Sequence, residues 1–539
     1  MRLRKLVGHN AVAFVFMLAA SGEDLSQVGL QKQLFVDDYV ISTKENVSRQ
    51  VGEAQKYGVV LEPSLDTDVH PLQRGPDPGQ PVKYSQEGWG DFSSQRKSDG
   101  TPVAVDFGFY STVLRNERAN KFQMWYMAWR GAGIGYAESK DGIHWTKPLV
   151  GVGVTDRNTG NIIKRAQAFS CMIDPTVEWG APDKFKAAFD SNLDKGSEGE
   201  RLNRCGLGYS SDGIHWRDYN SGEAVTGRSA GTQNQIFWDP GIEKYRLLTR
   251  TDYFGDWGHC RTMRIMVHTG NNDLVNAPTA WETAVDKILL DPPTSWEDLS
   301  FTDRVPPKQM HGMNLWYYEG VYFQLMDVYT QSRDHTQLFE GWDYQNRHDN
   351  DCFDFYIGTS RDPEIVDTSW VTANRPIIAR GPAGSFDQDG VRPMSQIITY
   401  NDEHWLYYAG SSERHWARGR DLKIGLAKLR LDGFVFLEAG EDWGMVTTRP
   451  FRLDGDSLEV NIDASGGEFV IELLDEAGTP YFDYGRDTNR FWNGVEETHL
   501  QYSWRGDRDL ADRKGDIVRL RFHLRNAKLY SFTIQRSES

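Results

Sequence analysis

SKDGIHW (139–145) and SSDGIHW (210–216) are two copies of one seven-residue phrase, and they begin 71 residues apart. Two short alternating stretches precede each copy: KFQMWYMA (121–128) and GIGYAES (133–139), then KFKAAFD (184–190) and CGLGYSS (205–211). Alternation with a period of two is typical of β-strands, and Asp-Gly favours a tight turn because glycine accepts positive φ. The phrase therefore predicts a strand–strand–turn unit, in which Trp fills the space between units and His is a turn residue.

The same unit recurs in three later stretches that match the pattern less closely. KYRLLTRT (244–251), VYFQLMDVY (321–329) and HWLYYAG (404–410) each begin another copy. The turn aspartates of the five copies are spaced by 71, 61, 89 and 70 residues: Asp141, Asp212, Asp273, Asp362 and Asp432. Five repeats of a few strands each are the signature of a propeller. We predict an all-β chain with a five-bladed β-propeller over 106–435.

The flanking segments have different compositions. Residues 436–539 form short alternating strands with Gly/Asp turns, which predicts a C-terminal β-sandwich. Residues 1–21 have a basic start and a short apolar run, as in a secretory signal peptide, so we expect a secreted or periplasmic protein without a membrane span. Residues 22–105 are read as an extension whose strand at 33–41 braces or closes the propeller, or braces the sandwich.

Charge and composition limit the partners. The formal net charge of −17 argues against nucleic acid, whose binding requires an excess of Lys and Arg. The chain has 18 Trp and 23 Tyr, which suit strands and stacking on sugar rings. Four cysteines are too sparse for a disulfide scaffold; either a Cys171–Cys205 bridge or buried thiols fit the pattern. The oligomeric state is not indicated.

Candidate site residues follow from the predicted propeller, because ligands bind at the axial mouth lined by the first strand of each blade. Polar groups precede or accompany these strands in all five repeats. The carboxylates are candidates for the acid and nucleophile or base of glycoside hydrolysis: Asp106, Asp174, Asp387 and Asp389. The substrate-binding candidates are Tyr110, Asn234, Gln235, His311 and Arg392.

Several longer stretches resemble a known family. They are QLFVDDYVI (33–41), the two GIHW phrases, VRPMSQIITYNDEHWLYYAGSSE (391–413) and the ending from LRLDGFVFLEAGEDWG (429–444) to LRFHLRNAKLYSFTIQ (520–535). Together they resemble secreted bacterial five-bladed propeller glycosidases of the family 32/43 clan. The resemblance implies three acidic residues in the central pocket. Asp174 in "IDP" matches the position of the acid that stabilises the transition state.

The family 32 motifs are matched only in part. The Asn-Asp-Pro-Asn-Gly nucleophile motif is replaced by VDFGFYS (105–111), so Asp106 is a candidate by position, and the Glu-Cys motif of the general acid has no counterpart. Candidates for the proton donor are Asp387, Asp389, His311 and Glu340, the last in QLFEGWDY (337–344).

The sequence thus predicts an exported glycoside hydrolase that acts on plant or algal poly- or oligosaccharides. The funnel formed by a five-bladed ring favours exo-attack at chain ends. Two alternatives stay open. One is a carbohydrate-binding propeller without catalysis; the other is a polysaccharide lyase in which His311 or a Tyr acts as base beside Arg392 and Lys308. No cofactor is required, although an axial calcium or other cation would suit Asp-rich segments.

Overall fold

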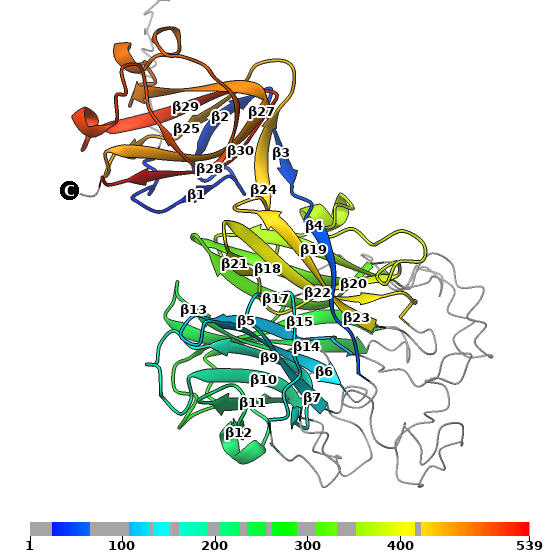
Figure 1. The fold of residues 1–539 in the computed structure, drawn as a ribbon. Coiled ribbons are helices and arrows are strands. Elements are labelled where there is room, and N and C mark those ends of the chain that lie inside the picture. Colours follow the sequence, from blue (N-terminus) through cyan, green and yellow to red (C-terminus); the bar gives the residue numbers. More distant parts are fainter. Residues whose placement is uncertain are drawn as a thin grey trace, which may run out of the picture.

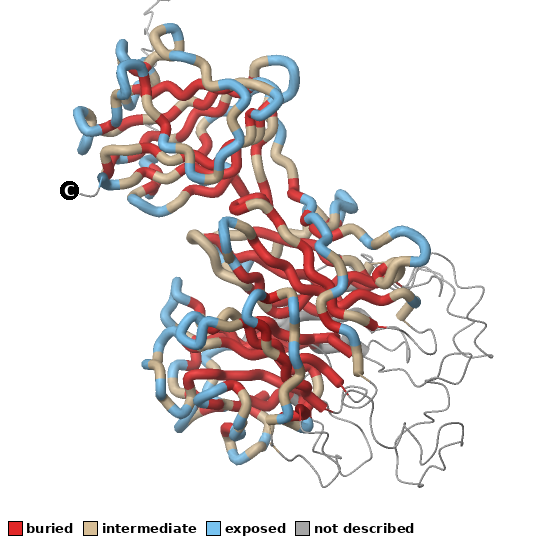
Figure 2. Tube along the Cα trace, in the orientation of Figure 1, coloured by how far each residue is buried: buried red, intermediate tan, exposed pale blue. Residues whose placement is uncertain are grey.

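The structure is a computed structural model of the chain, shown in Figure 1. It describes residues 24–64, 107–128, 133–150, 152, 161–191, 204–226, 234–254, 261–287, 308–330, 352–415 and 422–537. Within these ranges the protein is an all-β propeller followed by a β-sandwich. Buried residues follow the strands, and exposed residues gather at the turns between them (Figure 2).

The first three predicted repeats each form a four-stranded antiparallel sheet. The first contains β5 (Thr112–Asn116), β6 (Lys121–Ala128), β7 (Gly133–Ser139) and β8 (Ile162–Lys164). The second contains β9 (Gln167–Ile173), β10 (Phe185–Ser191), β11 (Arg204–Ser210) and β12 (Arg217–Asp218), followed by the 3-10 turn η3 (Tyr219–Gly222). The third contains β13 (Gln235–Asp239), β14 (Lys244–Phe254), β15 (Arg261–Asn271) and β16 (Thr283–Lys287).

The last two repeats share one eight-stranded sheet. Its strands are β17 (Lys308–Tyr318), β18 (Val321–Thr330), β19 (Cys352–Ser360), β20 (Gly390–Pro393), β21 (Ile398–Tyr400), β22 (Glu403–Ser411), β23 (Leu422–Arg430) and β4 (Gln55–Leu61). A single parallel pair, Phe353 with Gly390, joins β19 to β20, and the short helix α2 (Ser369–Thr372) lies between them in the chain. Five as the number of blades stays a prediction.

The strand that closes the propeller comes from the N-terminal segment. β4 pairs antiparallel with β23, so that the last repeat receives its outermost strand from the start of the chain. The segment 33–41 supplies β1 (Gln33–Leu34), which pairs with β30 (Ala527–Gln535) of the sandwich, and ends at Ile41, where the next strand begins. The segment therefore braces the sandwich, and β4 closes the propeller.

The sandwich is a ten-stranded assembly that also uses N-terminal strands. Besides β1 and β30 it contains β2 (Ile41–Glu45), β3 (Ser48–Val51), β24 (Val435–Ala439), β25 (Gly444–Thr448), β26 (Phe451–Arg452), β27 (Ser457–Asp475), β28 (Trp492–Tyr502) and β29 (Ile517–Arg525). Three 3-10 turns lie in its loops: η7 (Phe482–Tyr484), η8 (Arg486–Thr488) and η9 (Ala511–Arg513). β3 and β24 pair where the two parts of the molecule meet (Figure 1).

Both GIHW phrases form the same turn against a neighbouring blade. Gly142 and Gly213 have φ of 75° and 79°, and a Cβ at Gly142 would lie 2.7 Å from the Tyr407 hydroxyl. Tyr407 donates to the carbonyl of Gly142 at 2.7 Å, and the Trp125 indole donates to the carbonyl of Gly213 at 2.6 Å. Glycine is needed here for both its φ and its lack of a side chain. The phrase thus docks one blade on the next.

A buried carboxylate, Asp432, connects the propeller to the sandwich. It forms an ion pair of 3.1 Å with Lys32 and accepts hydrogen bonds from the Tyr318 hydroxyl at 2.7 Å and the Ser531 hydroxyl at 2.7 Å. Asn461 donates to the same carboxylate at 3.2 Å. These partners come from the N-terminal segment, the propeller and the sandwich. We call Asp432 with Lys32, Tyr318, Asn461 and Ser531 the junction cluster.

His404 completes the junction from the propeller side. Its Nε2 accepts a hydrogen bond from the backbone N–H of Asp432 at 3.0 Å, while Nδ1 lies 3.0 Å from the Thr399 hydroxyl. The ring is fully buried, and burial lowers its pKa to about 3. Ion pairing with Lys32 and the hydrogen bonds of the junction lower the pKa of Asp432 in spite of its burial. The junction is therefore built around a neutral imidazole and an ionised carboxylate.

Candidate functional site

Side-chain hydrogen bonds link the first strands of neighbouring blades. The Thr112 hydroxyl lies 2.6 Å from the Ser395 hydroxyl and accepts the backbone N–H of Cys171 at 3.1 Å. Gln235 donates to the carbonyl of Leu315 at 2.9 Å and accepts from its N–H at 2.7 Å. We call these bonds, which involve β5, β9, β13 and β17, the central layer.

A polar cluster lies on one side of this layer, where β5 and β17 begin. Arg392 Nη2 lies 2.9 Å from the Tyr110 hydroxyl and 2.9 Å from His311 Nδ1, and Tyr110 and His311 are 3.2 Å apart. Asp327 from β18 accepts from Nε of Arg392 at 3.2 Å and from Nη2 at 2.5 Å. We call these four residues the axial cluster. The structure thus brings together three of the predicted binding residues, Tyr110, His311 and Arg392.

The Arg392 guanidinium is held rigidly. Its Cζ lies 4.1 Å from the centre of the Phe109 ring and 3.9 Å from that of Phe353, and Asp327 occupies the Nε–Nη2 edge. Stacking and a bidentate carboxylate together fix both the plane and the direction of an arginine. Among the described residues, no acceptor reaches the remaining nitrogen, Nη1, although it is buried. The cluster therefore has an unused donor at its centre.

Burial and two cations set the protonation states of the cluster. Burial, then Arg250 and Arg392, hold the pKa of His311 well below its ordinary value, so the ring is neutral at pH 7. Because Nδ1 faces the Arg392 donor, we assign the ring proton to Nε2. Burial raises the pKa of Tyr110 and also that of Asp327, where Arg392 opposes the effect. The cluster combines a neutral base, a phenol and a guanidinium.

The sequence-based reasoning missed Asp327 and Arg250 because it examined only the first strand of each blade. Both lie on the second strand of a blade. Asp327 is six residues after Val321, the first residue of β18, and Arg250 is six residues after Lys244, the first residue of β14. Asp190 occupies the same place after Lys184. All three are at most 5% exposed. A charge at this position of an apolar strand, repeated in successive copies, is the signal that could have identified them.

Asp174 lies on the other side of the central layer from the axial cluster. Tyr110 precedes Thr112 by two residues, whereas Asp174 follows Cys171 by three, and equivalent strands run in the same direction around the axis. Asp174 is fully buried in an ion pair with Lys186 and a hydrogen bond from the Tyr245 hydroxyl. These contacts are those of a brace between β10 and β14.

The two candidate acids of the last repeat have different surroundings. Asp387 is 1% exposed; it pairs with Lys56 of β4 at 2.6 Å and accepts from the Tyr408 hydroxyl at 3.0 Å. Asp389 is half-buried beside Cys352, whose thiol lies 3.9 Å from Oδ1. Asp389 precedes Arg392 by three residues, and its carbonyl accepts the N–H of Phe353. Among the described candidate acids, it is therefore the one that lies nearest to Arg392 in the chain and is not paired with a cation at salt-bridge distance.

The remaining candidates complete the account. Gln235 is part of the central layer described above. Asn234 is fully buried, and its side-chain amide has no partner among the described residues. Asp106 and Glu340 lie outside the described residues. Lys308 donates to Asn374 Oδ1 at 2.8 Å and to the Tyr356 hydroxyl at 3.1 Å, away from the axial cluster.

The cysteines, the groups that could bind a metal and the helices of the described ranges complete the description. Cys171 and Cys205 are buried free thiols, as is Cys352, so the conceivable Cys171–Cys205 bridge does not form. No group of three or more His, Cys, Asp or Glu side chains in these ranges is arranged to hold a metal ion. None of the helices described has the length and apolarity required to span a membrane.

Comparisons with known proteins give structural similarity only. No protein-family model matches the chain, and no curated protein matches its sequence. A thermostable family-43 glycoside hydrolase is 14% identical with a TM-score of 0.40, over 62% of this chain and 94% of its own. The exo-β-1,3-galactanase of Phanerochaete chrysosporium is 9% identical with a TM-score of 0.32, over 82% of this chain and 98% of its own.

A third similar structure has another activity. An N-acetylgalactosamine deacetylase from F. plautii, in complex with blood group B trisaccharide, is 12% identical with a TM-score of 0.38, over 72% of this chain and 97% of its own. Because similarity at this level carries no activity, the function must be argued from the chain's own residues. Membership of glycoside hydrolase family 32 stays a prediction.

Proposed function

We propose that this protein is an exported glycoside hydrolase that acts on the chain ends of plant or algal poly- or oligosaccharides. The observation that carries the proposal is the axial cluster: a neutral imidazole, a phenol and a stacked guanidinium whose Nη1 has no partner among the described residues, gathered where β5 and β17 begin. Convergent polar groups on an otherwise apolar framework are typical of a binding site for a small polar ligand.

The cluster suits a sugar ring better than it suits an ion. Arg392 Nη1 and the His311 Nε2 proton would donate to hydroxyl oxygens. Hydrolysis also requires two carboxyl groups that flank the scissile bond. We assign these roles to Asp389 and Asp106. Asp174 and Asp387, which are paired with Lys186 and Lys56, are assigned to bracing the blades.

Elimination is the second candidate, because one observation favours it. Tyr110, His311 and Arg392 lie within 3.2 Å of one another, and a lyase uses such groups to remove a proton beside a carboxylate that a cation neutralises. The two reactions leave different products. A lyase forms an unsaturated uronate that absorbs ultraviolet light, whereas a hydrolase forms only a new reducing end.

The test is a screen of plant and marine polysaccharides and chromogenic terminal-sugar glycosides, with reducing ends and ultraviolet absorbance both recorded. Asp389→Asn should lower the rate of hydrolysis at least a hundredfold, because a carboxyl that transfers a proton contributes about 10²–10⁴. Asp174→Asn should lower stability and leave the rate per folded molecule unchanged. Equal rates for wild type and Asp389→Asn would remove Asp389 from the mechanism; ultraviolet absorbance would establish elimination.

A further inference from the structure

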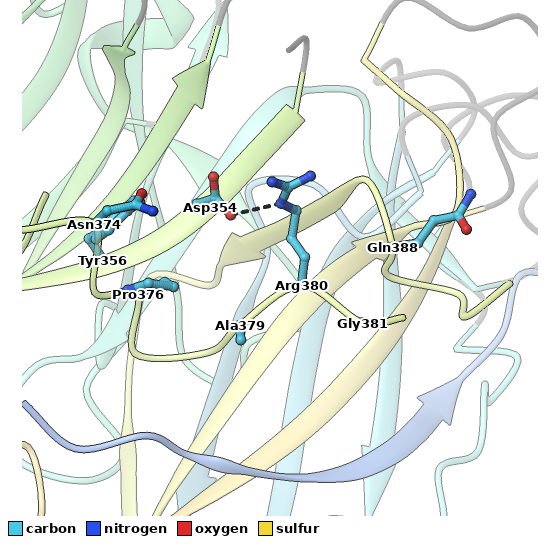
Figure 3. Close-up of a pocket in the computed structure, with 8 residues that line it drawn as sticks. All are labelled: Asp354, Tyr356, Asn374, Pro376, Ala379, Arg380, Gly381 and Gln388. Atoms are coloured by element: carbon cyan, nitrogen blue, oxygen red, sulfur yellow. Dashed lines mark hydrogen bonds and ion pairs between the residues drawn. The ribbon is translucent and has the colours of Figure 1, made fainter. Parts of the chain in front are cut away.

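We propose that a second sugar ring of the glycan binds outside the axis, in a pocket between β19 and the segment that leads to β20, through two neighbouring hydroxyls. The pocket has a volume of about 410 Å³, within the usual range of about 300–1,000 Å³ for small-molecule sites. Figure 3 shows its lining, which includes Asp354, Asn374, Arg380 and Gln388. This inference rests on the proposed function and names the substrate feature that the protein would recognise.

Three polar groups in the pocket have unused hydrogen-bonding capacity. Arg380 Nε donates to Asp354 Oδ1 at 2.9 Å, and Figure 3 shows the rest of the guanidinium extending past Asp354. Within the described ranges, no protein group bonds the two Nη nitrogens of Arg380, Oδ2 of Asp354 or Nδ2 of Asn374. The Asn374 carbonyl oxygen is already used by Lys308 and the Tyr356 hydroxyl, which fixes the amide with its NH₂ free.

This set of donors and acceptors matches a vicinal diol. Each sugar hydroxyl accepts one hydrogen bond and donates another, so a pair of hydroxyls can accept from Arg380 and Asn374 and donate to Asp354. Pro376 and Ala379, which also line the pocket, offer apolar surface for the face of the ring. A lone anion would use Arg380 but would be repelled by Asp354.

The charge balance also favours a neutral ligand. Asp354 makes a salt bridge with Arg380. Its negative charge also opposes the burial that lowers the pKa of Lys308. The negative charge of Asp389 likewise helps to raise the pKa of Arg380. Arg380 and Asp354, the charged residues that line the pocket, balance one another, and Lys308 and Asp389 nearby add one charge of each sign. An uncharged, hydroxyl-rich ligand is the class that such a site would take.

The pocket is connected to the axial cluster by two chain segments. On β19, Phe353 stacks on Arg392 in the cluster, and the next residue, Asp354, lines the pocket. Before β20, Gln388 lines the pocket, and its neighbour Asp389 is the proposed catalytic acid. The pocket and the axial cluster are therefore linked through the backbones of β19 and of the segment before β20.

The experiment measures binding rather than turnover. Saturation-transfer NMR is recorded on the full chain with methyl α-D-mannopyranoside, which has a cis diol, and with its 2,3-O-isopropylidene derivative, in which the diol is blocked. We expect transfer to the first probe only. Arg380→Met and Asn374→Ala should each weaken that binding about tenfold, the effect of losing a hydrogen bond to a charged or fixed polar group. Arg375→Met, an exposed arginine on the same segment, is the matched control and should bind as wild type does.

Several outcomes would overturn the inference: equal binding by Arg380→Met and Arg375→Met, equal transfer to both probes, or no transfer to the mannoside in wild type. Retained thermal unfolding temperatures would show that the variants are folded. Activity is recorded separately on the same preparations. Loss of probe binding with intact hydrolysis of a monosaccharide glycoside supports the pocket, whereas binding without any hydrolysis would refute the proposed function alone.

Discussion

The axial cluster and the junction cluster contain nearly the same residue types, yet they differ in how completely these residues are bonded. Each has a buried aspartate, a tyrosine, a cation and an adjoining neutral histidine. At the junction, Asp432 has four side-chain partners and His404 uses both ring nitrogens. In the axial cluster Arg392 Nη1 has no partner among the described residues.

This difference separates a structural network from a candidate site. A fully bonded buried network contributes rigidity and leaves nothing for a ligand, whereas an unused buried donor is costly unless a ligand or water completes it. Residue type alone therefore does not identify function; the unmet hydrogen bond does. The four predictions below test this distinction, from the largest expected effect to the smallest.

Removal of the junction carboxylate should have the largest effect on stability. Asp432→Ala leaves Lys32 without its partner, and breaking a buried pair in this way costs about 3–5 kcal/mol of the free energy of unfolding. Denaturant titration measures the loss. Asp402→Ala, at a more exposed ion pair with His499, should cost at most about 1 kcal/mol. A loss below 1 kcal/mol at Asp432 would show that the junction is not a stabilising network.

Two matched tyrosines compare the clusters directly. Tyr110→Phe removes the hydroxyl that bonds Arg392 and approaches His311, and it should lower kcat/KM about 10- to 100-fold, as expected for a hydrogen bond to a charged group. Tyr318→Phe removes the hydroxyl that bonds Asp432, and it should cost about 1–3 kcal/mol of stability without altering kcat/KM. The opposite assignment of effects would reverse our comparison.

The junction also predicts how stability depends on pH. His404 has a pKa of about 3 in the folded protein and about 6.5 when unfolded, so between these values the unfolded state binds one more proton. The free energy of unfolding should therefore decrease as pH falls below 6.5, by up to about 1.4 kcal/mol per pH unit.

Buffers from pH 7 to 4 and chemical denaturation test this slope. His404→Gln should flatten it in part, because His311, whose pKa is also held low, keeps its own contribution. Asp432, with a lowered pKa, adds a loss of stability in the same direction below about pH 4. An unchanged slope in His404→Gln would contradict the buried neutral imidazole.

The histidines of the two GIHW turns should have the smallest effect. The side chains of His144 and His215 are 84% and 68% exposed, and each pairs with the aspartate of its own turn, Asp141 or Asp212. The double change His144→Ala and His215→Ala should alter the free energy of unfolding by less than about 1 kcal/mol and leave activity unchanged. A large loss of activity would give this repeated turn a functional role that the structure does not suggest.

The repeats in the sequence predicted the architecture. The residues of the axial cluster were predicted only in part. Tyr110, His311 and Arg392 were found because they lie near the start of first strands. Asp327 was missed, since a single charge in VYFQLMDVYT reads as a variation in an apolar strand. Asp174 follows its strand instead of preceding it, and the direction of a strand along the axis has no local signal.

Pairing between distant segments was equally hidden from the sequence. The closing strand QKYGVVL (55–61) has a weak alternating pattern, and nothing in it names β23 as its partner. The segment 33–41 has the stronger pattern, so we considered it, and not 55–61, as a strand that closes the propeller or braces the sandwich. Likewise the junction cluster joins Lys32 to Asp432 and Ser531, residues that only the folded chain brings together.

The N-terminal strands that close the propeller and brace the sandwich have a consequence for synthesis on the ribosome. β4 must wait for β23, and β1 must wait for β30, because each partner strand is translated much later than the strand it pairs with. Contacts between such distant segments carry a high entropic cost and form late. The propeller therefore cannot close before β23 is translated, nor the sandwich before β30, and removal of the first 61 residues should leave both the propeller and the sandwich with open edges prone to aggregation.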